Sequence, residues 1–287
     1  MNKTSIEWVK NPDGTQGYTW NPITGCLNGC PYCYARKLAN GWLKPLYLAN
    51  ENTVMKFSDG YAPMRLKVTD PFYPRLWPKR LEEQLGVYPR GIFVCDMGEL
   101  FGDWVPDDWI GQVLHKMTAV NYQQHRFYLL TKQPQNLIKW SPFPENCWVG
   151  VTATNQQMLD ASMPYLLQIE ATVRFASFEP LLERIDVSWY LRDPNYNDGS
   201  WYQDSKGVER WDLGGAPCNP LDWLIIGAQT KPYKPPKIEW VQEIVQAADR
   251  AGVSVFLKDN LWSIFPDDEI IPTWAQMEKG KYRQELP

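Results

Sequence analysis

Three of the six cysteines of this chain lie within eight residues. Cys26, Cys30 and Cys33 follow a C-x3-C-x2-C pattern. Gly29 and Pro31 lie between them and disfavour a regular helix or strand, because Gly accepts positive φ and Pro fixes φ and removes a donor. The sequence therefore predicts a loop whose thiolates can wrap one centre, followed by a helix that begins at about Tyr34.

Several centres could use such a loop. A [4Fe–4S] cluster is held by Cys thiolates, and three of them would leave one iron open. A structural zinc would need a fourth Cys or His at a matching spacing. Neither His115 nor His125 has a partner at that spacing, and Cys95 and Cys147 lie in apolar runs. Cys218 stays a candidate distant fourth ligand, and a disulfide framework is the third alternative.

The elements that must position this loop alternate regularly between predicted strands and predicted helices. Apolar runs rich in β-branched and aromatic residues recur at 92–96, 127–131, 147–152, 173–177, 223–227 and 253–257. Stretches of helical period lie between most of them, such as 106–120 and 240–251. Buried strands that alternate with helices indicate βα units and a parallel sheet. With a first strand ending near Trp20, we expect about seven strands in a partial or complete parallel (β/α) barrel, in a single domain over 1–287.

Polar residues follow nearly every predicted strand. Since the chemistry of a parallel barrel lies at the carboxyl ends of its strands, their recurrence predicts a ligand-lined mouth. Each one alone could equally be a helix cap or a turn residue. The candidates, in chain order, are Glu99, Thr152, Thr154, Asn155, Glu179, Gln229 and Lys258.

Two segments interrupt this alternation. Residues 185–221 are rich in Asn, Asp, Gly, Pro and Trp and read as an insertion after the fifth strand, either a lid or a featureless loop. Residues 36–90 carry ten basic against five acidic side chains, whereas the whole chain has a net charge of −4. Within this basic segment, the Pro- and aromatic-rich stretch 70–80 is expected to lie over the surface, with a short helix near 81–85.

The cysteine spacing, with Tyr32 in the aromatic place of C-x3-C-x-aromatic-C, resembles the signature of the radical S-adenosylmethionine (radical SAM) superfamily. Over about 6–260 the chain also resembles one phage- and prophage-associated radical SAM family, long described as a domain of unknown function. The segments that carry this likeness include Thr19-Trp-Asn-Pro-Ile-Thr-Gly-Cys26, Leu130-Thr-Lys132, Glu179-Pro-Leu-Leu182 and Phe256-Leu-Lys258. The chain departs from that family at 97–99, 133, 154 and 228–229, so the substrate of relatives is not transferred.

The resemblance implies a [4Fe–4S] cluster on the three cysteines, with SAM bound at the open iron as the second cofactor. It implies an external electron donor of the flavodoxin or ferredoxin kind. The implied ligands of SAM are Met97, Gly98 and Glu99 for the amino group, Thr152, Thr154 and Asn155 near the ribose, and Tyr32 near the adenine. Glu179, Gln229 and Lys258 would face the substrate and take part in catalysis, and the 185–221 insertion would exclude water.

The substrate stays open at this point. The phage setting of the resembled family, the basic segment and the many aromatic residues favour a base of DNA or RNA. A small metabolite or a peptide is the alternative substrate, and a non-catalytic, zinc- or cluster-stabilised nucleic-acid-binding module is the alternative of another class. The start of the chain lacks the apolar core of a signal peptide, and no apolar run is long enough to span a bilayer. We therefore expect a cytoplasmic protein that needs no membrane, and the sequence leaves its oligomeric state open.

Overall fold

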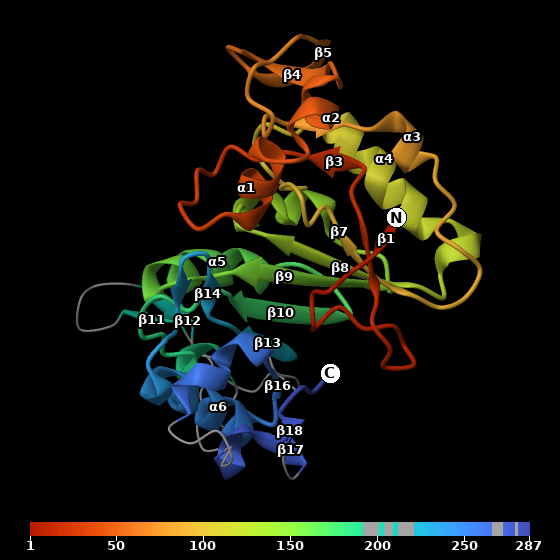
Figure 1. The fold of residues 1–287 in the computed structure, drawn as a ribbon. Coiled ribbons are helices and arrows are strands. Elements are labelled where there is room, and N and C mark those ends of the chain that lie inside the picture. The colour runs from red at the N-terminus through yellow and green to blue at the C-terminus, as the bar shows by residue number, and fades with distance from the viewer. Residues whose placement is uncertain (192–200, 204–208, 212–220, 266–271, 279–280) are drawn as a thin grey trace. The chain divides into compact units, whose positions relative to one another are not determined.

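A computed structural model describes residues 1–191, 201–203, 209–211, 221–265, 272–278 and 281–287 (Figure 1). The chain divides into two compact units. The first comprises Met1–Val151 with Gln168–Thr172, and the second comprises Thr152–Leu167 with Val173–Pro287. In the part of the chain that the structure describes, no helix is both long and apolar enough to cross a membrane.

The first unit contains a mostly parallel row of five strands. In spatial order these are β1 (Asn2–Lys3), β2 (Tyr18–Trp20), β7 (Gly91–Val94), β8 (Arg126–Thr131) and β9 (Cys147–Thr152). Only β1 runs antiparallel to its neighbour. Every residue of β7 and β9 is buried, as expected of parallel strands covered on both faces. The helix α4 (Asp107–Thr118) follows β7, with two acidic residues in its first turn and two basic residues in its last, which suits the helix dipole.

A second, antiparallel sheet lies in the same unit. Its order is β3 (Ile23–Thr24), β6 (Arg75–Leu76), β4 (Asn52–Phe57) and β5 (Gly60–Arg65). The short helices α1 (Tyr34–Asn40), α2 (Lys44–Leu48) and α3 (Pro78–Leu81) accompany it. The helix expected at 81–85 lies instead at Pro78–Leu81, and residues 82–85 are not helical. Pro78 occupies a first-turn position of this helix, where its missing N–H has no cost.

The surface position predicted for 70–80 is wrong for most of 71–75, whereas Pro78 and Lys79 are exposed as expected. Phe72 and Arg75 are 1% and 0% exposed. The Arg75 guanidinium donates to five backbone carbonyl oxygens, those of Asn50, Val68, Asp70, Pro71 and Tyr73, at 2.7–3.4 Å. Since Arg presents five donors in a fixed fork, it satisfies the carbonyls of a Pro-rich stretch that forms almost no regular structure. The segment is therefore folded around a buried cation.

The second unit contains three parallel strands, β10 (Val173–Phe178), β13 (Trp223–Ile226) and β16 (Ser254–Leu257). Its helices are α5 (Gln156–Leu166) and α6 (Ile238–Ala251), and α6 ends at Gly252 in the left-handed conformation, φ +67°. Three small antiparallel hairpins also belong to it: β11 (Trp201–Gln203) with β12 (Glu209–Trp211), β14 (Gln229–Thr230) with β15 (Tyr233–Lys234), and β17 (Gln276–Glu278) with β18 (Lys281–Tyr282).

Six short 3₁₀ helices complete the described elements. Three lie in the first unit, at Val120–Tyr122, Pro134–Asn136 and Ile138–Trp140. Three lie in the second, at Ser188–Tyr190, Asp259–Ile264 and Thr273–Ala275.

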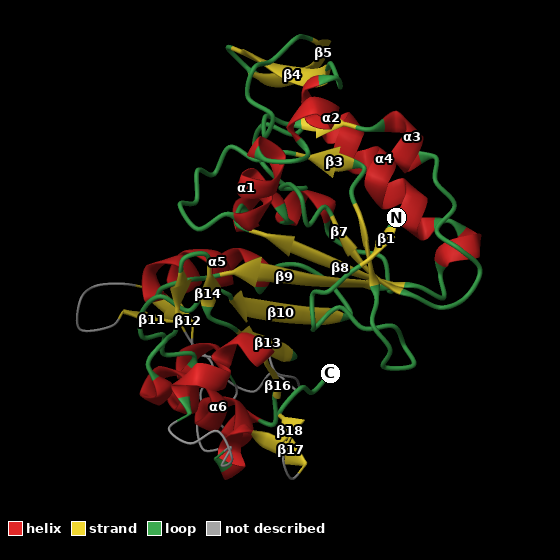
Figure 2. Cartoon of the chain, viewed as in Figure 1, coloured by secondary structure: helices red, strands yellow, loops and turns green. Residues whose placement is uncertain are grey.

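The predicted α/β class with a mostly parallel sheet is confirmed (Figure 2). Each apolar run is a strand within one or two residues of its expected bounds, and with β2 the parallel strands number seven. Among the described residues no closed barrel is seen, and the row of strands in each unit is open. Most of the 185–221 insertion lies outside the described residues, so its function as a lid stays a prediction.

Candidate cysteine-loop site

The cysteine loop is joined directly to the segment that follows β7. Gly25 N–H donates to the Met97 carbonyl at 2.9 Å, and Glu99 N–H donates to the Gly25 carbonyl at 3.2 Å. Gly25 has φ +90°, and a Cβ there would lie 2.4 Å from the Tyr73 carbonyl oxygen. Only glycine fits this position without strain. The structure thus brings together Cys26 and the 97–99 segment, as the parallel sheet led us to expect.

Two of the three loop sulfurs accept backbone hydrogen bonds. Cys26 Sγ accepts from Asn28 N–H at 3.4 Å, and Cys33 Sγ accepts from Arg36 N–H at 3.3 Å as the cap of α1. All three cysteines are half-buried free thiols. Burial, and secondarily the charge of Glu99, raises the pKa of Cys26 to about 12. The hydrogen bond from Asn28 N–H lowers the pKa of Cys26 against the larger effect of burial, and N–H donors to sulfur are a regular feature of thiolate metal centres.

The loop fits a metal centre by donor type and spacing. In the described ranges, no three His, Cys, Asp or Glu side chains are gathered at metal-ligand geometry. Cys218, the candidate fourth ligand, lies outside the described residues, and Cys95 and Cys147 are buried free thiols. Three thiols on one short loop suit a cluster with one open iron, whereas a structural zinc requires four protein ligands.

The carboxylate of Glu99 is buried beneath the loop. One oxygen accepts from the Thr131 hydroxyl at 2.6 Å and from Phe101 N–H at 3.3 Å. The other accepts from Lys132 N–H at 2.9 Å and from the Asn28 side-chain amide at 3.4 Å. Burial raises the pKa of Glu99, while the bonds from Thr131 and Lys132 lower it. Glu99 therefore ties the loop to the end of β8, in addition to its predicted role toward SAM.

The two residues before Glu99 pack against the loop. Met97 is buried in an apolar cluster against which Cys26 and Cys33 pack. A Cβ on Gly98 would lie 3.1 Å from both Thr24 Cα and the Gly25 carbonyl oxygen. Because Gly98 has no side chain, the backbone at Thr24 and Gly25, where the cysteine loop begins, can pack directly against it. Tyr32 lies within the loop and is half-buried.

Sequence reasoning missed the asparagines that hold this site. The Asn21 side chain accepts from Met97 N–H at 2.9 Å and donates to the Asp96 carboxylate at 2.6 Å. The Tyr34 hydroxyl donates to the Asp96 carbonyl at 2.8 Å, which links α1 to the same segment. Burial raises the pKa of Asp96, whereas the bonds from Asn21 and Tyr34 lower it. The available signal was position, since Asn21 directly follows β2 and Asn28 lies between the cysteines.

In the second unit, the residues predicted near the ribose of SAM have local partners. Thr152 and Thr154 are buried, and the Thr154 hydroxyl donates to Met158 Sδ at 3.2 Å. Asn155 caps α5 by accepting from Met158 N–H at 2.9 Å. Asn155 is therefore a helix cap, which was the alternative reading of such polar residues. Binding of a ligand by Thr152, Thr154 or Asn155 stays a prediction.

The three residues predicted to face the substrate also lie in the second unit, and two of them are paired. The buried Lys258 ammonium forms an ion pair with Glu179. A Cβ on Gly227 would lie 2.9 Å from Lys258 Cδ and 3.2 Å from Glu179 Cγ, so Gly227 makes room for the pair. Asn260, which also follows the last parallel strand, holds Ala228: its side-chain oxygen accepts from Ala228 N–H at 2.9 Å, and its side-chain amide donates to the Ala228 carbonyl at 3.0 Å.

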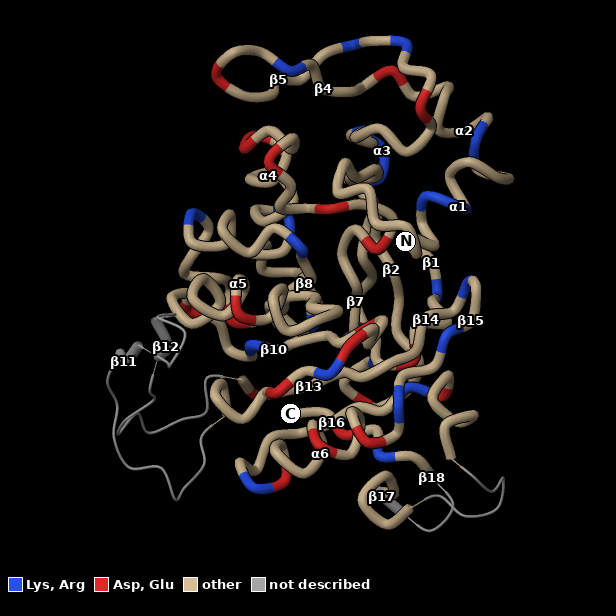
Figure 3. Tube along the Cα trace, turned by 90° about the vertical axis from the view of Figure 1, so that its left-hand side faces the viewer, with Lys and Arg blue, Asp and Glu red and all other residues tan. Residues whose placement is uncertain are grey.

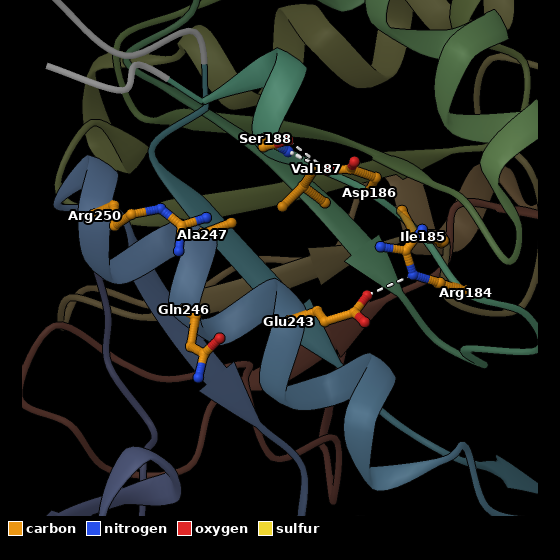
Figure 4. A pocket seen from close by; sticks show the side chains of 9 residues that line it. All are labelled: Arg184, Ile185, Asp186, Val187, Ser188, Glu243, Gln246, Ala247 and Arg250. Atoms are coloured by element: carbon orange, nitrogen blue, oxygen red, sulfur yellow. Dashed lines mark hydrogen bonds and ion pairs between the residues drawn. The ribbon is translucent and has the colours of Figure 1, made fainter. Parts of the chain in front are cut away.

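The third of them, Gln229, belongs to the β14–β15 hairpin. Its side-chain amide donates to the Pro232 carbonyl at 2.8 Å. Elsewhere in this unit, a hollow of about 200 Å³ lies between residues 184–188 and α6 (Figure 4). Two of its lining residues form an ion pair, from Arg184 Nε to Glu243 at 2.6 Å. None of the predicted site residues lines this hollow.

The fold and the site together define an α/β protein with a mostly parallel sheet, in which the strands β2 and β7 position a three-cysteine loop. The chain belongs to the family described as protein of unknown function DUF5131, whose model matches residues 3–282. Neither curated proteins nor solved structures gave a match to this chain.

Proposed function

We propose that this protein is a radical SAM enzyme whose Cys26, Cys30 and Cys33 hold a [4Fe–4S] cluster, and that it acts on a base of nucleic acid. When bound and reduced, the cluster would supply the electron for reductive cleavage of SAM, and this radical chemistry would remove a hydrogen atom from the substrate, with methionine and 5′-deoxyadenosine as products. An external electron donor of the flavodoxin or ferredoxin kind would reduce it. The cofactors supply this chemistry, and the protein binds and orients them.

One observation carries the proposal. The cysteine loop follows β2, and residues 97–99 follow β7, the parallel neighbour of β2. The N–H and the carbonyl of Gly25 are both hydrogen-bonded to this 97–99 segment. The two segments to which the resemblance assigns cluster and SAM amino group are therefore adjacent. The buried Glu99 carboxylate holds Asn28 between two of the cysteines, so it orients the loop. The N–H groups of Asn28 and Arg36 support the charge of Cys26 and Cys33 as thiolate ligands.

A nucleobase substrate is supported by the surface of the first unit. Six of the ten basic side chains in 36–90 are exposed: Lys37, Lys44, Lys56, Arg65, Lys67 and Lys79. Large exposed apolar residues accompany them, among them Trp42 at 74% exposure. Basic groups beside exposed rings suit phosphates and bases, whereas a small metabolite needs no such extended surface.

The test is anaerobic reconstitution with iron and sulfide, followed by dithionite and SAM, with iron, zinc and 5′-deoxyadenosine measured. The proposal expects an iron–sulfur absorption band and 5′-deoxyadenosine, both lost in Cys30→Ala. The matched control is Cys147→Ala, since Cys147 is buried within β9 and outside the loop. Stoichiometric zinc without an iron cluster, or full turnover in Cys30→Ala, would overturn the proposal and favour a zinc-stabilised binding module.

A further inference from the structure

The β4–β5 hairpin of the first unit exposes an apolar face. Its strands pair from Asn52↔Arg65 to Phe57↔Gly60, and it stands out from the rest of its unit (Figure 1). Because side chains alternate across a strand, Met55, Phe57 and Met64 lie on one face of this ribbon. They are 42%, 45% and 38% exposed. Exposed apolar side chains that gather on one face of a projecting hairpin are typical of an interaction surface.

The opposite face and the base of the hairpin are basic. Lys56 and Arg65 lie on the face that also carries Tyr61, and Lys67 follows the second strand. Figure 3 shows basic positions along β4, β5 and the chain next to them. Arg65 comes within 3.9 Å of Glu51, but its side chain is 80% exposed, so this pair holds it weakly. Basic residues on one face and large apolar residues on the other give the ribbon two distinct surfaces.

We propose that the β4–β5 hairpin is the element of this protein that engages double-stranded DNA. This inference rests on the proposed function and names the substrate form. Six residues per strand span about 20 Å, enough to lie along a groove of the duplex. Phe57 and the two methionines form a wedge that enters the minor groove between base steps, as apolar wedges do in proteins that kink a duplex. The long side chains of Lys56, Arg65 and Lys67 reach the phosphates that border this groove. Opening the duplex exposes a base to chemistry that a stacked base escapes.

The same features favour DNA over a protein electron donor. A donor must approach the cluster closely, whereas the hairpin carries its apolar residues on a ribbon that extends away from the cysteine loop of the same unit (Figure 1). A duplex is long enough to contact the ribbon and continue along the unit. Charge complementarity also favours it, since the exposed charges from Lys56 to Lys67 are three basic against Asp59 alone.

The test measures binding of the full chain to a 2-aminopurine-labelled duplex of about 20 base pairs at several salt concentrations. The triple variant Lys56→Gln/Arg65→Gln/Lys67→Gln is expected to bind at least about tenfold more weakly and to reduce the slope of log K against log salt by about 2.7. Phe57→Ser is expected to keep the slope and lose the 2-aminopurine signal of an unstacked base. Lys3→Gln and Tyr88→Ser, exposed in the same unit, are the controls.

Iron content and 5′-deoxyadenosine formed without DNA are measured on the same variants. If the variants lose DNA binding but keep normal iron content and 5′-deoxyadenosine formation, the inference is supported. Loss of iron or of 5′-deoxyadenosine would instead show that the cluster site had failed. Equal binding by the triple variant and by Lys3→Gln would overturn the inference. So would a preference for single strands, or a defect confined to reduction by flavodoxin.

Discussion

The hydroxyl of Thr131 donates to the carboxylate of Glu99 at 2.6 Å, although 32 residues separate them in the chain. Thr131 is the last residue of β8, and Glu99 lies in the segment that leaves β7. Through Asn28 the same carboxylate reaches the cysteine loop, 71 residues earlier. One buried acid thus connects three segments at the carboxyl ends of neighbouring strands.

Thr131→Val should destabilise the protein by about 1–3 kcal/mol, because it removes a donor to the buried Glu99 carboxylate and the acceptor of Gln133 N–H while the shape is kept. The free energy of unfolding in urea measures the loss. Thr172→Val is the control, since Thr172 is exposed and its hydroxyl donates to a carbonyl. If both variants lose the same free energy of unfolding, the hydrogen bond to Glu99 contributes no more to stability than an exposed one.

Arg75→Lys should cost at least about 2 kcal/mol of unfolding free energy, because an ammonium has three donors where the guanidinium serves five carbonyls. The exposed Arg65→Lys should change stability by less than about 0.5 kcal/mol. Both are measured by urea unfolding. A fully stable Arg75→Lys protein would mean that the 70–76 segment folds without this network.

The stability of the protein should fall as the pH drops below about 6.5, the ordinary pKa of histidine. His125 is buried, its Nδ1 accepts from Arg90 N–H and its Nε2 bonds the Gly86 carbonyl, and burial lowers its pKa. The unfolded chain therefore binds the proton first, and protonation there removes up to about 1.4 kcal/mol per pH unit.

The check is the melting temperature between pH 8 and 5.5. His125→Gln should flatten this dependence at the cost of lower stability at pH 8, because one of the two ring bonds is lost. The other histidine, His115, is exposed on α4, and His115→Gln should leave the slope as it is. An unchanged slope in His125→Gln would assign the pH dependence to other groups.

Lys258→Met should destabilise the second unit by about 3 kcal/mol, since it leaves the Glu179 carboxylate without its cation in a largely buried place. Adding Glu179→Gln should restore part of the loss, giving a coupling free energy above about 1 kcal/mol in a double-mutant cycle. Arg184→Met with Glu243→Gln, an exposed pair of the same unit, should couple by less than about 0.5 kcal/mol. Additive losses at Lys258 and Glu179 would contradict the prediction.

By itself the sequence determined the seven parallel strands, the helices α4 and α6 and the presence of a three-cysteine loop, but not the antiparallel sheet of β3, β6, β4 and β5. Strands buried on both faces must be apolar throughout, so each could be found as a run, and α4 and α6 could be found by their helical period. Sequence position alone also placed Cys26 and Glu99 at the ends of neighbouring parallel strands.

Only the tertiary structure decided what the polar groups contact. It placed Asn155 at a helix cap, buried Glu99 under four donors and folded 70–76 around Arg75. The physical reason is that a run or a period reports which face of an element is buried, whereas the partner of a buried donor or acceptor is set by segments that are distant in the chain. Such partners leave no periodic trace in the sequence.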